Sequence, residues 1–194
     1  MNASRIPGQR AGLSRDRVLG AAREQIAEAG LEGLTMRALA DRLGVTPNAL
    51  YSHVESKTGL VDDLLDDVLA EVDEPALGGD PRAALHDLMS STYDVLLAHP
   101  DLVPVYLARQ GARGENAQRL GEIMLTQLER AGIGGPAARE AQRVLIVHTI
   151  GFAAFTSSAA GDPRVLAPNE LRSNFEAGLH WLLAGIGVAT QAGP

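Results

Sequence analysis

Side chains suited to contact nucleic acid gather between positions 37 and 57. A short segment that follows a turn exposes a ring, an amide and a methyl group at Pro47, Asn48 and Ala49. A phenol, an imidazole and an ammonium follow at Tyr51, His53 and Lys57. The first group suits base edges and the second suits phosphate oxygens. The pattern indicates a DNA-binding surface, and Arg37 would add a base or phosphate contact.

Side chains that could support catalysis or bind a metal are scattered along the chain. The five histidines are His53, His86, His99, His148 and His180, and they lie in different expected helices without a short ligand spacing. The carboxylates between residues 62 and 73 follow the helical period opposite an apolar face, which is typical of a solvated surface. The chain has no cysteine, no HExxH motif and no GxSxG motif. We therefore expect no enzyme, no cofactor and no metal site.

Two short helices joined by a tight turn would position the DNA-binding surface. The spacing of one apolar helix face is followed by Met36, Leu39, Ala40 and Leu43. Gly44 is suited to the left-handed conformation that ends a helix. Thr46 is expected to cap the second helix with its hydroxyl, and Pro47 fits the first helical position. This pattern predicts a helix-turn-helix, whose second helix would enter the major groove.

The rest of the chain predicts an all-α fold. Helical periodicity recurs throughout, and aromatic residues make up only 4% of the chain. We predict a flexible arm over residues 1–13, a three-helix helix-turn-helix domain over 14–57 and a helical body over 58–194. The first helix starts at the cap Ser14 and ends at Gly30. Later helices are expected at 56–72, 81–98, 102–109, 115–131, 136–160 and 168–186. Arg5 and Arg10 of the arm would reach a minor groove, or the arm has no role.

The net charge of −7 is unevenly distributed. Residues 1–57 hold eight Lys or Arg against six Asp or Glu, whereas the remaining residues hold nine against eighteen. A protein with this asymmetry would approach DNA with its first part only. The sequence lacks the apolar segment of a signal peptide or a membrane span, so we expect a cytoplasmic protein without a membrane partner.

The last two expected helices are rich in glycine and alanine, which permit close helix approach. Two such helices from each subunit would form a four-helix dimer interface. The predicted interface residues are Gly151, Ala154, Ser158, Phe175, Gly178, Leu179 and Leu182. The alternative is that both helices pack inside a monomer.

The segment from Leu13 to Leu65 resembles the DNA-binding domain of TetR-type transcriptional repressors. The resemblance is carried by AGLEGLTMRALADRLGV, by LYSHVESK and by the leucine-rich helix that follows. The body is similar, through LLAHPDLVPVYLA, to the C-terminal class of the tetracycline repressors. The resemblance implies base contacts from Arg37, Thr46, Pro47, Asn48 and Ala49, and phosphate contacts from Tyr51, His53 and Lys57.

The same resemblance implies a homodimer that binds a palindromic operator on double-stranded DNA and is released by a small-molecule effector. Residues 58–194 would then form a ligand-binding and dimerisation domain. The two recognition helices of such a dimer must lie about one helical turn of DNA apart, roughly 34 Å. An effector that favours another spacing would weaken DNA binding through the helix that links the two domains.

Three places in the chain depart from the tetracycline repressors. Asp73 and Tyr106 stand where those proteins carry metal-binding histidines, and the chain reads SSAAGD near Ala160, where a carboxylate is expected. We therefore expect neither tetracycline nor magnesium, but a small apolar or amphipathic effector. The predicted pocket wall consists of Leu65, Val68, Tyr93, Leu97, Tyr106, Met124, Leu128, His148, Phe152 and Phe155.

Two further hypotheses compete with a ligand-responsive repressor. An all-helical interaction module that does not bind DNA would keep the helices but would not need Tyr51 and Lys57 as phosphate contacts. An enzyme would need a constellation of catalytic residues, which the sequence does not contain.

Overall fold

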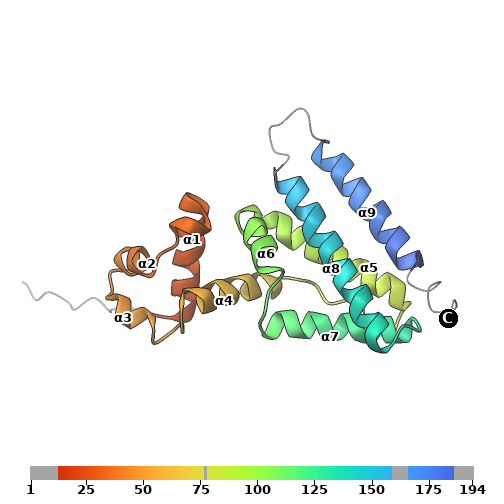
Figure 1. The fold of residues 1–194 in the computed structure, drawn as a ribbon, viewed down its shortest axis with the longest axis horizontal. Coiled ribbons are helices and arrows are strands. Elements are labelled where there is room, and N and C mark those ends of the chain that lie inside the picture. The colour runs from red at the N-terminus through yellow and green to blue at the C-terminus, as the bar shows by residue number, and fades with distance from the viewer. Residues whose placement is uncertain (1–12, 77, 159–165, 186–194) are drawn as a thin grey trace, which may run out of the picture. The chain divides into compact units, whose positions relative to one another are not determined.

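The computed structural model describes residues 13–76, 78–158 and 166–185. Every regular element in these ranges is helical, which confirms the predicted all-α class (Figure 1). The chain divides into two compact units, Met1–Leu60 and Val61–Pro194, so the division falls three residues after the predicted boundary at residue 57. The expected arm lies outside the described residues except for Leu13. None of the described helices has the length and apolar character needed to cross a lipid bilayer.

Unit 1 is built from α1 (Arg15–Gly33), α2 (Met36–Leu43), α3 (Pro47–Leu50) and the first residues of α4 (Lys57–Leu69). Ser14 caps α1 as predicted, since its hydroxyl accepts a hydrogen bond from the amide of Arg17 at 3.3 Å. Apolar side chains from all four helices are fully buried, among them Val18, Ala22, Leu39, Leu50 and Leu60. A small hydrophobic core therefore holds the short helices of this unit together.

The first helix does not end at Gly30 as predicted. Gly30 breaks the helical conformation with a φ of 68°, but a further helical turn follows as far as Gly33. A positive φ is readily adopted by glycine, so the residue produces a kink rather than an end. Leu34, which follows this turn, is fully buried and anchors the chain before α2.

Unit 2 contains residues 61–69 of α4 and five further α-helices. These are α5 (Pro81–Ala98), α6 (Val103–Arg109), α7 (Glu115–Arg130), α8 (Gly135–Ser158) and α9 (Pro168–Gly185), with a 3₁₀ turn at Pro100–Leu102. Asp80 caps α5 through the amide of Ala83 at 3.0 Å. In Figure 1, α8 lies against α5, α6, α7 and α9, and these neighbours contact it directly. The core of the unit therefore surrounds α8.

Candidate DNA-binding surface and ligand cavity

The turn between α2 and α3 has the geometry of a helix-turn-helix. The hydroxyl of Thr35 accepts a hydrogen bond from the amide of Ala38 at 3.1 Å and so caps α2. Gly44 ends α2 in the left-handed conformation with a φ of 67°, and its amide donates to the carbonyls of Ala40 and Asp41. The chain reverses within two residues of this glycine and enters α3 at Pro47.

Thr46 does not cap α3 through its side chain, contrary to the prediction. Its backbone is extended, with a φ of −79° and a ψ of 150°, and within the described residues its hydroxyl makes no hydrogen bond. The backbone carbonyl of Thr46 accepts instead from the amide of Ala49 at 2.9 Å. Because α3 is a single turn that begins with Pro47, few amides need a cap, and the exposed hydroxyl stays available to another partner.

The predicted base-contacting residues lie together on the surface of unit 1. Arg37 of α2 is exposed, and so are Thr46, Pro47 and Asn48 at the start of α3, whereas Ala49 is half-buried. Leu50 is fully buried and fixes α3 to the core of the unit. The arrangement leaves a guanidinium, a hydroxyl and an amide free to form hydrogen bonds with base edges.

The predicted phosphate-contacting residues follow α3 directly. Tyr51 is 50% exposed, and His53 and Lys57 are half-buried. The ammonium of Lys57 donates to the carbonyl of Leu31 at 3.4 Å, which ties the start of α4 to the end of α1. An ammonium has three donors, so this bond leaves Lys57 able to contact a phosphate.

An ion-pair cluster holds α2 against α1. The guanidinium of Arg42 donates to the carboxylate of Glu28 and, at 3.1 Å, to that of Glu24. The hydrogen bond with Glu28 is the main reason why the pKa of Arg42 is raised above its ordinary value. Both glutamates are exposed, so this cluster orients α2 rather than adding much stability.

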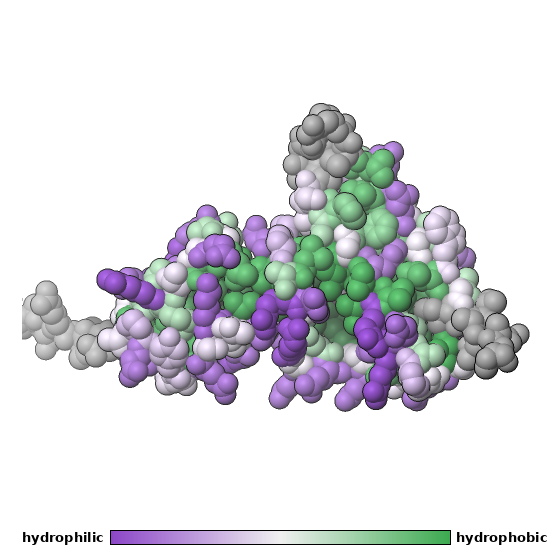
Figure 2. All heavy atoms as spheres, in the orientation of Figure 1, coloured by the Kyte–Doolittle hydropathy of each residue, from purple (hydrophilic) through white to green (hydrophobic). Residues whose placement is uncertain are grey.

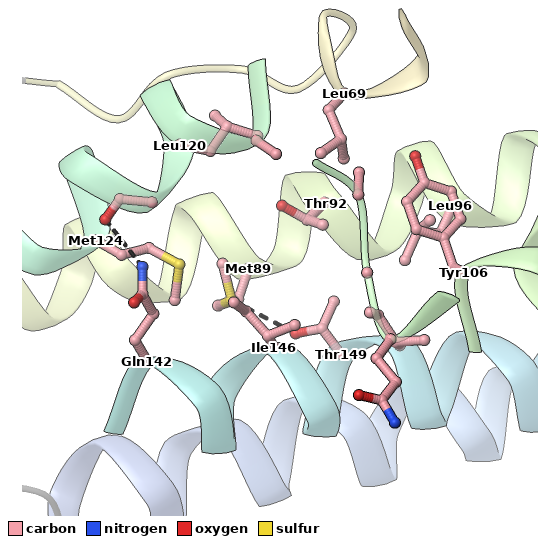
Figure 3. A pocket seen from close by; sticks show the side chains of 16 residues that line it. Leu69, Met89, Thr92, Leu96, Tyr106, Leu120, Met124, Gln142, Ile146 and Thr149 are labelled. Atoms are coloured by element: carbon pink, nitrogen blue, oxygen red, sulfur yellow. Dashed lines mark hydrogen bonds between the residues drawn. The ribbon is translucent and has the colours of Figure 1, made fainter. Parts of the chain in front are cut away.

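Unit 2 contains a partly open apolar cavity of about 210 Å³ (Figure 3). Its wall is formed by side chains of α4, α5, α6, α7 and α8 and by the turn that follows α6. The labelled residues of Figure 3 that line it are Leu69, Met89, Thr92, Leu96, Tyr106, Leu120, Met124, Gln142, Ile146 and Thr149. An adjoining outer pocket shares Tyr106, Gln110, Ile146 and Ile150 with the cavity and adds Arg143.

Only Tyr106 and Met124 of the ten predicted pocket residues line this cavity. Leu65, Val68 and Leu128 are fully buried core residues, Leu97 is half-buried beside the lining residue Leu96, and Phe155 is 66% exposed. The helix α8 is apolar nearly all round, so its sequence pattern did not reveal which face meets the cavity. The cavity face of α8 is formed by Gln142, Ile146, Thr149 and Ile150.

The remaining predicted pocket residues form an aromatic cluster between α5, α8 and α9. Tyr93 stacks on Phe175 with ring centroids 4.2 Å apart, and Phe152 lies 4.8 Å from His148. The Nε2 of His148 donates to the carbonyl of Phe175 at 3.0 Å. The hydroxyl of Tyr93 is 2.7 Å from that of Thr156. The polar atoms of this cluster are therefore hydrogen-bonded within the subunit. Its rings pack α9 against α5 and α8.

The predicted dimer interface also needs correction. Phe175 and Leu179 are fully buried within the subunit, and a Cβ at Gly178 would lie 2.6 Å from Cε1 of His148. Phe175 and Gly178 therefore lie against His148 of α8 in the same chain, and Leu179 belongs to the core. Gly151, Ala154 and Leu182 are half-buried, and Ser158 is exposed.

A set of exposed apolar side chains on α8 and α9 was missed from the sequence. It consists of Val144, Val147, Phe155 and Trp181, which are 44%, 69%, 66% and 73% exposed. Figure 2 shows hydrophobic residues gathered on the surface over α8. The spacing from Val144 to Val147 and Phe155 is that of one helix face, so a signal was present. We call these four residues the α8–α9 apolar face.

Three polar contacts join α4 to the end of the cavity formed by α6 and α7. Asp62 binds the guanidinium of Arg109, with Oδ1 3.0 Å from Nε, and the hydroxyl of Tyr106 donates to the carbonyl of Leu65. Asp66 is 9% exposed, and its carboxylate accepts from the amides of Asn116 and Ala117 at 3.1 and 2.8 Å. Asp66 thus caps α7 from another helix. We call these contacts the α4 latch.

Asp73 and Tyr106 stand where the resemblance places metal-binding histidines. Asp73 is exposed, and its amide donates to the hydroxyl of Ser91 at 2.9 Å. Within the described residues, no group of three or more His, Asp or Glu side chains is arranged to hold a metal ion. The segment around Ala160 lies outside the described residues.

The sequence resembles known regulatory proteins. The family described as "Bacterial regulatory proteins, tetR family" matches residues 18–64. An HTH-type transcriptional regulator from Saccharopolyspora erythraea is 36% identical over 123 residues, which cover 63% of this chain and 52% of that protein. The class A tetracycline repressor from transposon 1721 of Escherichia coli is 32% identical over 153 residues, which cover 77% of this chain and 69% of that repressor. The chain spans about half the length of the first curated relatives it matches.

Solved structures are similar over most of the chain. ActR from Streptomyces coelicolor in complex with (S)-DNPA has a TM-score of 0.76 at 25% identity, covering 92% of this chain and 99% of that one. BioQ, a protein of Mycobacterium smegmatis, matches in a crystal with its double-stranded DNA operator. That match has a TM-score of 0.70 at 26% identity and covers 91% of this chain and 99% of BioQ.

Proposed function

Since the chain belongs to the TetR family of bacterial regulatory proteins, we propose that it is a ligand-responsive transcriptional repressor that binds a palindromic operator as a homodimer. A small molecule in the cavity of unit 2 would weaken this binding. The observation that carries the proposal is the group of exposed polar side chains at the start of α3, where the Thr46 hydroxyl does not cap the helix. This group lies next to Arg37 and is followed by Tyr51 and Lys57.

The similarity to BioQ supports DNA as the partner, because BioQ is described with a double-stranded operator. Thr46 and Asn48 would read base edges in the major groove, and Lys57 would contact a phosphate. An interaction module without DNA would have no use for an exposed hydroxyl and amide beside a tyrosine and a lysine at this turn.

The α8–α9 apolar face supports the homodimer. Four large apolar side chains exposed on two helices are costly in water, and a second copy of the same face would bury them. Gly151, Ala154 and Ser158 lie along the same stretch of α8 and allow close approach of the helices. A two-fold axis through this face would relate unit 1 of one subunit to unit 1 of the other, which is the symmetry of a palindromic operator.

The α4 latch supports the response to a ligand. Tyr106 and Ala117 line the cavity and also take part in the latch, so a ligand that moves either residue acts on α4. The helix α4 begins in unit 1 at Lys57. A ligand that binds one arrangement of the latch more tightly than another increases the population of the first arrangement. The size of the shift follows from the difference between the two affinities. ActR, which is described with (S)-DNPA, is a relative that binds a small molecule.

The proposal is tested by selecting bound sequences from random double-stranded DNA with the purified protein. We expect a two-fold symmetric motif whose half-sites lie about one helical turn apart. The variant Asn48→Ala should lose the preference for particular bases within each half-site, and the variant Arg82→Ala, at an exposed position of unit 2, should retain it. Recovery of no motif at low salt would contradict DNA reading by this surface.

A further inference from the structure

We infer that the cavity of unit 2 takes an uncharged aromatic molecule of one or two rings that carries a hydrogen-bond donor. The inference deepens the proposed function and rests on it, since it treats this cavity as the effector site. It follows from four properties of the cavity: the charge of its wall, its volume, its sulfur atoms and one fixed amide.

The wall of the cavity excludes a charged ligand. Among the described residues that line it, none has a side chain that is charged at neutral pH. Arg143 lies in the outer pocket, but its side chain is 70% exposed and is paired with Glu140 at 3.2 Å. Moving a carboxylate or an ammonium from water into such a cavity without a partner costs several kcal/mol. The ligand is therefore neutral in its buried part.

The volume of the cavity limits the size of the ligand. An engineered apolar cavity of about 150 Å³ in another protein holds one benzene molecule. The present cavity of about 210 Å³ is larger by less than half of that volume. It has room for a substituted six-membered ring or for two fused rings, and a larger ligand would have to extend into the adjoining outer pocket.

Two thioethers favour an aromatic ligand. Met89 of α5 and Met124 of α7 are 3% and 2% exposed and line the same cavity. Figure 3 shows both sulfur atoms at the end of the cavity where Gln142 lies. A thioether makes a favourable contact at the edge of an aromatic ring, and flexible methionines adapt to a flat ligand. A saturated hydrocarbon would fill the space without this gain.

Two side-chain amides line the cavity, those of Gln110 and Gln142, and a hydrogen bond fixes the orientation of the second. The hydroxyl of Thr92 donates to the carbonyl of Leu88 at 2.8 Å, and the hydroxyl of Thr149 has two acceptors, the carbonyl of Leu145 at 3.0 Å and Sδ of Met89 at 3.5 Å. Both hydroxyl protons are therefore used within the protein. The Nε2 of Gln142 donates to the carbonyl of Gly121 at 3.0 Å, which fixes the orientation of the amide (Figure 3). The Oε1 of Gln142 accepts no hydrogen bond from the described residues. This open acceptor favours a ligand with a donor, such as a phenolic hydroxyl.

Three commercial compounds of equal ring size test the inference on the unaltered, full-length protein. 2-Naphthol is neutral and carries a donor, naphthalene lacks the donor, and 2-naphthoate is charged. Calorimetric titration should give an affinity for 2-naphthol about five- to tenfold higher than for naphthalene, since one net hydrogen bond contributes about 1 kcal/mol. The affinity for 2-naphthoate should be at least a hundredfold lower than for 2-naphthol.

The variant Gln142→Leu identifies the acceptor. It should bind 2-naphthol no more tightly than naphthalene, while its affinity for naphthalene stays within about twofold of the original protein. Gln118→Leu is the matched control, because Gln118 is exposed on α7 and does not line the cavity. Thermal unfolding of both variants verifies that they fold. If Gln142→Leu does not fold, the comparison of the three ligands on the unaltered protein decides the inference.

The outcomes separate this inference from the proposed function. Equal or tighter binding of 2-naphthoate would overturn the neutral ligand, and an unchanged preference for 2-naphthol in Gln142→Leu would overturn the role of Gln142. Failure of all three compounds to bind at millimolar concentration, in a protein that still selects its DNA motif, would overturn the ligand class and leave the repressor. Binding of 2-naphthol by a protein that selects no DNA would support the ligand class and contradict the repressor.

Discussion

Thr46 is the residue whose role in the structure differs most from the role predicted from the sequence. The order Thr-Pro is typical of a helix cap, but here the hydroxyl makes no hydrogen bond within the described chain. Thr35, eleven residues earlier, does cap its helix. Threonine therefore stabilises the fold at position 35, whereas at position 46 its hydroxyl is free to contact DNA.

This difference predicts opposite effects of one substitution at the two sites. Thr35→Val should lower the free energy of unfolding by about 1 kcal/mol, because the amide of Ala38 loses its acceptor. Thr46→Val should change it by less than about 0.5 kcal/mol and should weaken operator binding instead. Urea unfolding and operator titration measure the two quantities. A loss of stability in Thr46→Val equal to that in Thr35→Val would contradict the free hydroxyl.

Lys57 has one internal contact and further donors to spare. If it binds a phosphate, Lys57→Ala should weaken binding to all DNA sequences alike and lower the slope of log K against log salt by about one. Arg82→Ala removes an exposed charge from unit 2 and should leave the slope unchanged. A slope that is the same in Lys57→Ala as in the original protein would exclude this phosphate contact.

At the scale of elements, α4 owes its position in unit 2 to buried polar contacts as well as to its leucines. Asp62, Leu65 and Asp66 lie on one face of α4, at i, i+3 and i+4, and all three contact α6 or α7. Gly114 is required beside Asp66, since a Cβ there would lie 2.3 Å from the Asp66 carboxyl carbon. The turn before α7 and the acidic face of α4 therefore depend on each other.

The α4 latch can be tested by removing its buried carboxylate. Asp66→Ala leaves the amides of Asn116 and Ala117 without an acceptor and should lower the free energy of unfolding by about 2 kcal/mol. Glu122→Ala, at an exposed position of α7, should change it by less than about 0.5 kcal/mol. Urea unfolding measures both variants, and a neutral effect of Asp66→Ala would show that the cap adds nothing.

At the scale of the whole molecule, the two surfaces of α9 have different tasks. One surface buries Phe175 and Leu179 within the subunit, and the other exposes Trp181, the single tryptophan of the chain. The apolar stripe that suggested a dimer interface is the inward one. We expect the dimer to use the outward one.

Substitutions on the two surfaces should therefore have different outcomes. Trp181→Glu should give a folded monomer with unchanged helical circular dichroism, because it charges an exposed side chain of the α8–α9 apolar face. Phe175→Glu should unfold unit 2, since it buries a charge without a partner. Gln118→Glu, at an exposed position of α7, should stay a dimer. Light scattering gives the masses, and a Trp181→Glu dimer would rule out this face.

The sequence by itself determined the fold class, the order and approximate bounds of the helices and the helix-turn-helix. These depend on local properties such as the period of apolar residues, the cap at Ser14 and the glycine at position 44. Such signals act within a few residues, so a single chain contains them in full. The exposed set at the start of α3 was predictable for the same reason, and its contact with bases stays a prediction.

Only the tertiary structure decided which faces of α8 and α9 line the cavity, fill the core or meet solvent. Hydrophobicity tells that a face is buried but not against what, and α8 is apolar around most of its circumference. The packing of α9 takes His148 and Phe152 away from the cavity and turns Gln142 and Thr149 towards it. The side chains of a helix face show that the face is buried. Which element covers that face depends on how the helices pack.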